Sequence, residues 1–202
     1  MIQLLPNKYY HVYNHANGNE NLFREDENYL FFVKQYGYYI NAVADTFAYS
    51  LMPNHFHLLI QIKSETELFE IFKGSAGFKE KDFNPSDIIS HCFSNLFNSY
   101  SKSYNKVFNR RGSLFNHKFK RKEVEDNDYL IKLIHYIHAN PVHHGFVKRI
   151  EDWKYISYHG ILSQGKTHLQ RSQVLEWFGG RDEFIRVHQQ QIDLKMTGEF
   201  FD

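Results

Sequence analysis

The sequence predicts an α+β fold in which helices pack on an antiparallel sheet. Strand-like and helix-like patterns follow one another as strand, helix, strand, strand and helix over the first 140 residues. The two adjacent strands are joined around Pro53-Asn54, a strong turn signal. At 202 residues the chain has the length of one domain, or of one domain with a terminal extension, and can bury a substantial core.

The first third of the chain supplies three strands and a helix. Residues 8–15 (KYYHVYNH) are rich in aromatic residues and alternate well enough for a strand. The acidic residues 25–27 would stabilise the N-terminus of a helix predicted over about residues 27–43. Two further strands are predicted at residues 47–51 and 55–62.

The middle of the chain adds two longer helices. Residues 63–85 are polar and predict a loop with room for one short helix, and the periodicity then predicts a helix over about residues 85–108. Residues 113–124 alternate loosely, as in a hairpin or an edge strand. Asp126 should cap the next helix, and Pro141 should end it, because the residue before a proline disfavours helical backbone.

This order of elements suggests a ferredoxin-like sheet with its helices on one face. Beyond Gln164 the sequence predicts short helices at residues 172–178 and 181–190, followed by a loose tail. We therefore expect one domain over residues 1–160 and a C-terminal helical extension over residues 161–202.

Composition excludes several classes of protein. With 24 Lys and Arg against 23 Asp and Glu, the formal net charge is +1, so the chain as a whole is not an evident polyanion binder. The single cysteine, Cys92, excludes an internal disulfide framework and a Cys-based zinc module. The sequence shows no signal peptide, lipidation motif or long apolar run, so we expect a soluble, cytoplasmic protein with no membrane partner.

Two histidines one residue apart are the first candidate site residues. Side chains at alternate positions of a strand share a face, so His55 and His57 would point to one side and Phe56 to the other, where it can be buried. Two imidazoles on one face could bind one metal ion. The same pattern would also arise from a polar strand face that happens to carry two histidines.

Tyr136 and Asn140 stand four residues apart on a predicted helix and therefore share a face. Over the histidine strand, the two imidazoles and the amide oxygen of Asn140 could hold a divalent cation beside the phenol. Such a cation can polarise a phosphate, and a tyrosine beside it can act as a nucleophile. The alternative is that Tyr136 is a core aromatic residue and Asn140 ends the helix.

Two segments in this order carry a family resemblance. Residues 52–59 (MPNHFHLL) look like the histidine–hydrophobe–histidine motif of the HUH single-strand DNA endonucleases. Residues 136–142 (YIHANPV), followed by residues 144–147 (HGFV), are similar to the tyrosine helix and exit loop of the REP-associated tyrosine transposases, a single-tyrosine branch of insertion-sequence transposases. Residues 153–158 resemble the tryptophan-containing segment that follows in that group, and the likeness runs over about residues 9–158.

The resemblance implies a ferredoxin-like HUH core and a metal-dependent enzyme that nicks and joins single-stranded or hairpin DNA. It implies that His55 and His57 are ligands of Mg²⁺ or Mn²⁺. Tyr136 would attack the scissile phosphate, form a 5′-phosphotyrosine link and free a 3′-hydroxyl. Many relatives supply a glutamine as third ligand where this chain has Asn140. Relatives commonly work in pairs, so the resemblance also implies a homodimer.

Several alternatives stay open at this point. His135 and His138 are nearby candidates for the third ligand, and Tyr100 and Tyr104 are rival nucleophiles on the preceding helix. The same metal site could activate water instead, which would give a simple nuclease. The fold could also serve a non-catalytic or domesticated nucleic-acid-binding protein that does not turn over.

A basic segment between residues 102 and 123 is the candidate DNA-binding surface, with Glu123 as its one acidic residue. Basic groups neutralise phosphates, and the interleaved aromatic residues can stack on unpaired bases. The alternative is an ordinary solvated helix end and loop. The expected DNA-binding residues are Lys102, Lys106, Arg110, Arg111, Lys118, Lys120, Arg121 and Lys122. His143, His144 and Lys148 could add contacts.

Overall fold

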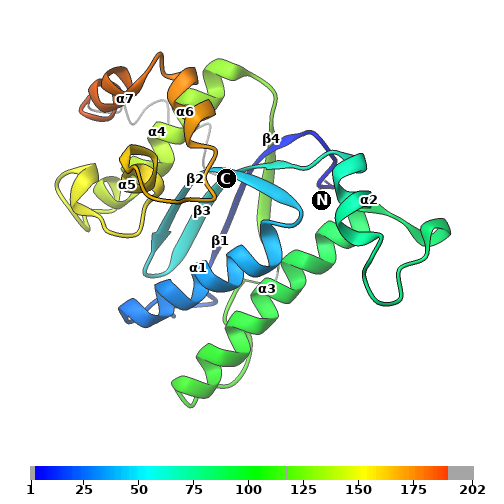
Figure 1. Ribbon diagram of the computed structural model, residues 1–202. Coiled ribbons are helices and arrows are strands. Elements are labelled where there is room, and N and C mark those ends of the chain that lie inside the picture. The colour runs from blue at the N-terminus through cyan, green and yellow to red at the C-terminus, as the bar shows by residue number, and fades with distance from the viewer. Residues whose placement is uncertain (1–2, 117, 191–202) are drawn as a thin grey trace.

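The fold, taken from a computed structural model that describes residues 3–116 and 118–190, is built on one antiparallel sheet (Figure 1). Its strands are β1 (Tyr9–His15), β2 (Ala44–Met52), β3 (His55–Ile62) and β4 (Lys120–Val124). The spatial order β2-β3-β1-β4 is that of a ferredoxin-like sheet, with β4 at an edge. The α+β class, the Pro53-Asn54 turn between β2 and β3 and the edge strand near residue 124 are therefore confirmed.

Helices cover both faces of the sheet, which corrects the expectation of helices on one face. Figure 1 shows α1 and α3 on one side and α4 to α7 on the other. The reason lies in the strands, since seven of the eight residues of β3 are buried and both of its faces need cover. The helices are α1 (Asp26–Ile40), α2 (Glu65–Phe72), α3 (Pro85–Val107), α4 (Asn127–His143), α5 (Ser157–Leu162), α6 (Arg171–Trp177) and α7 (Arg181–His188), with short 3-10 turns at Glu80–Asp82 and Ile150–Asp152.

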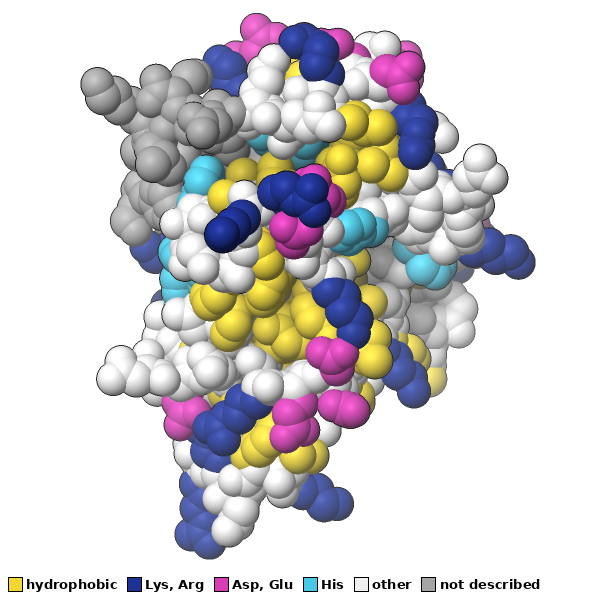
Figure 2. Space-filling model, turned by 90° about the vertical axis from the view of Figure 1, so that its left-hand side faces the viewer, with side chains coloured by type: hydrophobic (Ala, Val, Ile, Leu, Met, Phe, Trp, Pro, Cys, Tyr) yellow, Lys and Arg dark blue, Asp and Glu magenta, His cyan; other side chains and the backbone are white. Residues whose placement is uncertain are grey.

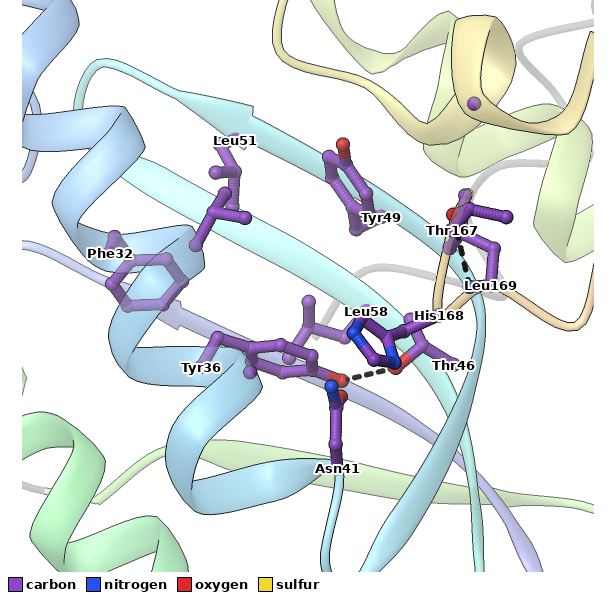
Figure 3. A pocket seen from close by; sticks show the side chains of 13 residues that line it. Phe32, Tyr36, Asn41, Thr46, Tyr49, Leu51, Leu58, Thr167, His168 and Leu169 are labelled. Carbon is purple, nitrogen blue, oxygen red and sulfur yellow. Dashed lines mark hydrogen bonds between the residues drawn. The ribbon is translucent and has the colours of Figure 1, made fainter. Parts of the chain in front are cut away.

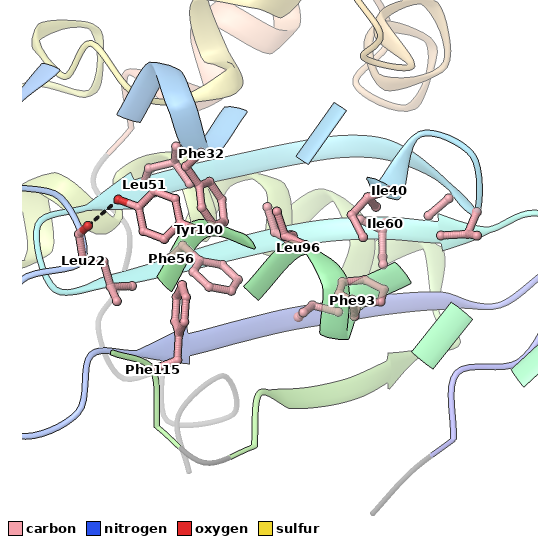
Figure 4. Packing of buried hydrophobic residues seen from close by; sticks show 14 of the residues in the cluster. Leu22, Phe32, Ile40, Leu51, Phe56, Ile60, Phe93, Leu96, Tyr100 and Phe115 are labelled. Carbon is pink, nitrogen blue, oxygen red and sulfur yellow. Dashed lines mark hydrogen bonds between the residues drawn. The ribbon is translucent and has the colours of Figure 1, made fainter. Parts of the chain in front are cut away.

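The first core lies between the sheet and the helices α1 and α3 (Figure 4). Phe56 of β3 is fully buried there, as the strand alternation predicted, and its ring lies 5.5 Å from that of Phe32 on α1. Phe93 and Leu96 bring α3 onto the same face. Burial of this apolar surface fixes β3, and therefore fixes the opposite face on which the histidines lie.

The second core joins α4 to the other face of the sheet and to the C-terminal helices. Leu59 of β3 and Ile134 of α4 share it with Val174 of α6 and Phe184 of α7. The two short helices predicted near residues 172–178 and 181–190 are thus present. The proposed domain boundary after residue 160 stays a prediction, and residues 191–202, with the expected loose tail, lie outside the described part of the chain.

The helix that carries Tyr136 begins as predicted but ends later. The side chain of Asp126 accepts a hydrogen bond at the N-terminus of α4. Pro141 lies inside the helix, which continues to His143, so the expectation that Pro141 ends it is wrong. A proline this near the C-terminus removes only one helical hydrogen bond. The helix then closes at Gly145 (φ 72°), with the backbone N–H of Phe146 donating to the Pro141 carbonyl oxygen at 2.9 Å.

None of the helices in the ranges described is both long and apolar enough to cross a membrane.

Candidate active site and nucleic-acid interface

The face of the sheet beneath α4 carries a cluster of histidines. His55 and His57 alternate along β3 and point to this face, opposite Phe56. The register of β1 places His15 opposite His55 and Tyr13 opposite His57. The side chains of His11, Tyr13 and His15, at alternate positions of β1, therefore lie on the same face. His11, His55 and His57 are all buried. The expected pair of imidazoles on one face is therefore part of a larger cluster.

Each of the two predicted ligand histidines is held through its Nδ1 atom. His55 Nδ1 lies 2.7 Å from the side-chain oxygen of Asn54, which can only accept, so Nδ1 carries the proton and Nε2 keeps a free lone pair. His57 Nδ1 lies 2.8 Å from His11 Nε2. Both contacts leave the Nε2 atom of the ligand histidine as the ring nitrogen available to a cation.

Burial keeps these imidazoles neutral. It lowers the pKa of His55 and of His11 to about 3, and it holds the pKa of His57 well below its usual value of 6.5. Neutral imidazole is the form that binds a metal ion. The electrostatics of the cluster therefore favour a ligand role over a protonated, phosphate-binding one at neutral pH.

Tyr136 and Asn140 approach this cluster from α4. The Tyr136 ring stands edge-on to His57, with ring centroids 5.7 Å apart, and to His11 at 6.3 Å. Burial raises the pKa of Tyr136 to about 12, an effect that the Asn140 amide opposes. The same amide opposes the effect of burial on the pKa of His55. Asn140 thus interacts with both the histidine strand and the phenol.

The side-chain oxygen of Asn140 accepts no hydrogen bond from the residues that the structure describes, although Asn140 is fully buried. Its Nδ2 atom lies 3.5 Å from the Tyr136 carbonyl oxygen, which is a weak contact. A buried amide oxygen with no donor is costly unless it serves another ligand. The oxygen is therefore a candidate ligand for a hard cation.

The alternatives to Asn140 lie elsewhere. Both ring nitrogens of His138 are hydrogen-bonded on the far side of α4, to His188 and Ser157, and the His135 ring packs beside His188 at 5.0 Å. Over the described ranges, no three His, Cys, Asp or Glu side chains are grouped as a metal site would require. A three-ligand site here therefore depends on the amide of Asn140.

Sequence reasoning missed His11 and His15, and it named His144 only as a residue that could contact DNA. His11 and His15 alternate on β1 with the period of a strand, which was visible in the sequence, but their pairing with β3 depends on a register that was not. The His15 ring stacks on His55 at 4.6 Å and 9°, and the His144 ring stands edge-on to His55 at 4.7 Å. The rings of His11, His15 and His144 thus pack around the pair of His55 and His57.

The rival tyrosines are engaged on the other face of the sheet. Tyr100 and Tyr104 lie on α3, in the first core, and are buried. Their hydroxyl groups donate to the backbone carbonyl oxygens of Leu22 and Asn21. Neither phenol reaches the histidine cluster, so of the three candidate nucleophiles Tyr100, Tyr104 and Tyr136, Tyr136 is the one that lies beside it.

The predicted DNA-binding residues divide between two surfaces. On β4, Lys120 pairs in register with Tyr13 and Lys122 with His11, so both lysines leave the sheet on the histidine face. The second surface is a cleft of about 720 Å³ between α3 and the segment that follows it. Its lining residues include Lys102, Lys118, Arg121, Phe97, Phe119, Asn98 and Asn105.

The cleft combines the group types that bind single strands, with cations for phosphates, amides for base edges and aromatic rings for stacking. Arg110 is different, because its side chain is only 15% exposed and forms an ion pair with Glu20 at 3.0 Å. It also donates to the Ser113 carbonyl oxygen at 2.8 Å. Arg110 is therefore placed to order the turn at residues 110–113, whereas Lys106 and Arg111 are exposed.

Hydrophobic side chains also line a smaller pocket, of about 240 Å³, between α1 and β2 (Figure 3). A hydrogen bond of 2.7 Å between the hydroxyl groups of Tyr36 on α1 and Thr46 on β2 lies at its wall. None of the predicted site residues lines it. Figure 2, which views the side of α1 and α5, shows an apolar centre with Lys, Arg, Asp and Glu side chains around it. Basic and acidic side chains are mixed on this surface, whereas residues 102–122 carry basic side chains and no acidic ones.

Comparison with known proteins identifies a relative in sequence. No family model matches the chain. A protein of Haemophilus influenzae that is provisionally named a REP-associated tyrosine transposase is 27% identical over 115 residues, which are 57% of this chain and 59% of that protein. The matched region thus spans about three-fifths of the relative's length.

A solved structure shares the fold. It is described as a REP-associated tyrosine transposase bound to a REP hairpin, and it superposes with a TM-score of 0.55 over 82% of this chain and 85% of that one, at 15% identity. The predicted ferredoxin-like, HUH-type core is therefore confirmed as a fold. At 15% identity, the similarity supports the shared fold but not a role for any single residue.

Proposed function

We propose that this chain, which resembles the REP-associated tyrosine transposases in sequence and in fold, is a metal-dependent endonuclease and strand transferase for single-stranded DNA. The observation that carries the proposal is the convergence of two elements. Tyr136 and Asn140 of α4 lie over the face of β3 that carries His55 and His57. A phenol beside three cation ligands is the arrangement that phosphoryl transfer by a tyrosine needs.

In this proposal His55, His57 and Asn140 hold Mg²⁺ or Mn²⁺. The donor set fits such an ion, since it combines two neutral imidazoles with a buried amide oxygen that lacks a hydrogen-bond donor among the described residues. When bound, the ion would polarise a phosphate oxygen and orient the scissile bond.

Tyr136 is proposed as the nucleophile. Its hydroxyl oxygen would bond to the scissile phosphorus while the bond from phosphorus to the 3′ oxygen breaks. The phenol loses a proton and the departing 3′ oxygen gains one, leaving a 5′-phosphotyrosine link. Attack by another 3′-hydroxyl would reverse the step and rejoin the strand without external energy, because the number of phosphoester bonds is conserved.

DNA would reach this site along the basic residues. Lys120 and Lys122 leave the sheet beside the histidine cluster, and Lys102, Lys118 and Arg121 line the cleft near α3. The solved structure with the same fold is bound to a REP hairpin. We therefore propose hairpin DNA with a single-stranded flank as the partner of this chain. A homodimer, implied by the family resemblance, is also proposed, and sedimentation velocity with and without DNA would test it.

One observation favours a second candidate, a nucleic-acid-binding protein without turnover. Tyr136 is only 1% exposed, and burial raises its pKa to about 12. The hydroxyl must therefore become accessible, and must lose its proton to a neighbouring base, before it can attack. A protein that only binds DNA needs neither step.

The test is covalent trapping. The protein is incubated with labelled hairpin DNA carrying a single-stranded flank, with Mn²⁺ or with a chelator, and run on a denaturing gel. A Mn²⁺-dependent protein–DNA adduct that is lost in Tyr136→Phe supports the proposed function. Cleavage without an adduct would indicate a water-using nuclease, and DNA binding without cleavage would indicate the second candidate. An adduct that survives in Tyr136→Phe would show that another residue is the nucleophile.

A further inference from the structure

The side of α4 that faces away from the histidine cluster carries a buried hydrogen-bonded chain. His138 lies two residues from Tyr136 and two from Asn140, so it projects to a different face of the helix. It is fully buried. Its Nδ1 atom lies 2.8 Å from His188 Nε2 on α7, and its Nε2 atom lies 2.6 Å from Ser157 Oγ at the start of α5.

The direction of these hydrogen bonds follows from the last one, which His188 forms within α7. His188 Nδ1 lies 2.7 Å from the Phe184 carbonyl oxygen, which can only accept, so this nitrogen carries the proton. In a neutral ring the Nε2 atom of His188 is then an acceptor. His138 therefore donates to it through Nδ1–H, which leaves His138 Nε2 to accept from the hydroxyl of Ser157.

At its other end, this set of hydrogen bonds reaches the backbone of the sheet at Tyr49 of β2. Ser157 Oγ accepts a hydrogen bond from the Tyr49 N–H of β2 at 2.9 Å. Burial lowers the pKa of His188 to about 3, so this ring is neutral, as the assignment requires. Ser157 Oγ lies 2.6 Å from His138 Nε2 but 3.4 Å from the Tyr49 carbonyl oxygen, so its hydroxyl donates to His138, and the His138 ring is neutral as well. This assignment gives a partner to both ring nitrogens of His138 and of His188.

We propose that this set of buried hydrogen bonds is a brace. It holds α4 in the orientation that places Tyr136 and Asn140 over the histidine cluster. His138, Ser157 and His188 are then positioning residues, and α7 is part of the working unit. The inference rests on the proposed function of Tyr136. Rotation of α4 about its axis would break several buried hydrogen bonds together and leave their partners unsatisfied, so the brace selects one orientation.

A matched pair of substitutions on α7 tests the brace. His188→Phe fills the same space but offers His138 no acceptor, whereas His188→Gln restores both a carbonyl oxygen and an N–H. We expect His188→Phe to lower the single-turnover rate of adduct formation by about tenfold to a hundredfold, because small misplacements of a nucleophile have effects of this size. Its dissociation constant for hairpin DNA should stay within about twofold of wild type. His188→Gln should recover most of the rate.

Phe93→Leu supplies the control for stability. Phe93 is buried in the first core, on the other face of the sheet, and has no role in the site. At a temperature where both variants remain folded, it should lose thermal stability but keep the rate. A wild-type rate in His188→Phe would overturn the brace. An equal loss of rate in Phe93→Leu would also overturn it, since the effect would then be one of stability alone.

A nuclear magnetic resonance measurement separates failure of the brace from failure of the proposed function. If wild type forms no adduct, the proposed function has failed, but the brace still predicts that His138 and His188 both carry their proton on Nδ1. It also predicts that His188→Phe shifts the ring resonances of Tyr136 and the side-chain amide of Asn140, and that His188→Gln restores them. Unshifted resonances in His188→Phe would show that the chain does not position α4.

Discussion

His11 Nε2 lies 2.8 Å from His57 Nδ1 across the ladder between β1 and β3, with both rings buried. His55 is held in the same manner by Asn54. Histidine ligands of metal ions are commonly fixed through the ring nitrogen that does not bind the metal. His11 and Asn54 therefore hold the two candidate ligand histidines through hydrogen bonds. These partners can be replaced without changing the ligands themselves.

Replacing His11 should weaken metal binding without removing a ligand. In His11→Phe the Nδ1 atom of His57 has no partner, so its ring is free to turn and to change tautomer. We expect the dissociation constant for Mn²⁺, measured by electron paramagnetic resonance titration, to rise by about tenfold or more. His11→Gln, which keeps a hydrogen-bonding group near Nδ1, should show a smaller effect. Equal Mn²⁺ affinity in wild type and His11→Phe would exclude His57 as a ligand.

Replacing Asn140 should raise the stability of the metal-free protein and weaken its binding of Mn²⁺. Its buried oxygen lacks a donor among the described residues, so Asn140→Leu, of similar volume, removes an unsatisfied polar group. We expect the metal-free variant to be more stable than wild type by about 1 kcal/mol. Thermal unfolding in chelator and in Mn²⁺ measures both effects, because the variant should also lose the stabilisation that Mn²⁺ gives to wild type. A less stable variant that still responds to Mn²⁺ would contradict a ligand role.

Local patterns were sufficient to predict the order of the elements and the faces of single strands and helices. The period of two placed His55 and His57 on one face, and the four-residue spacing placed Tyr136 with Asn140. These relations depend on neighbours in the chain. For the same reason the order of strands around Pro53-Asn54 could be predicted with the turn that joins them.

Long-range relations could not be predicted in this way. The pairing of His11 with His57 joins residues 46 positions apart and depends on the register of β1. The ion pair of Arg110 with Glu20 depends on how α3 packs beside the N-terminal loop, and it gives a residue predicted to bind DNA a structural contact. The choice of face for α4 depends on the total apolar surface of both sides of the sheet.

The basic residues should separate into two groups by their effects. Lys102 lines the cleft and is exposed, so Lys102→Ala should weaken single-stranded DNA binding and lower the slope of log affinity against log salt by about 0.7, with no loss of stability. Arg110→Ala should instead lower the melting temperature, because it removes the ion pair with Glu20 and the contact to Ser113. Fluorescence anisotropy at several salt concentrations and thermal unfolding measure the two effects. A salt slope unchanged in Lys102→Ala would remove the cleft from the DNA path.

Stability should fall as the pH is lowered from 6 to 5, because buried histidines resist protonation. Burial lowers the pKa of His11, His55 and His188 to about 3, whereas each titrates near 6.5 in the unfolded chain. Between these values the unfolded state binds more protons than the folded state, so stability is fully present above pH 6.5 and is lost as the pH falls toward 3. The loss from pH 6 to pH 5 should be on the order of 3 kcal/mol for the three rings together.

Urea unfolding at pH 6.0, 5.5 and 5.0 measures this slope, at pH values where most carboxyl groups stay ionised. The slope gives the number of protons taken up on unfolding, which should be about three from these rings. His188→Gln removes one of them and should lower that number by about one, whatever it does to stability at pH 7. If the slope is unchanged in His188→Gln, His188 is already protonated in the folded protein. Its Nε2 atom could then not accept from His138, and the direction assigned to the buried chain on α4 would be wrong.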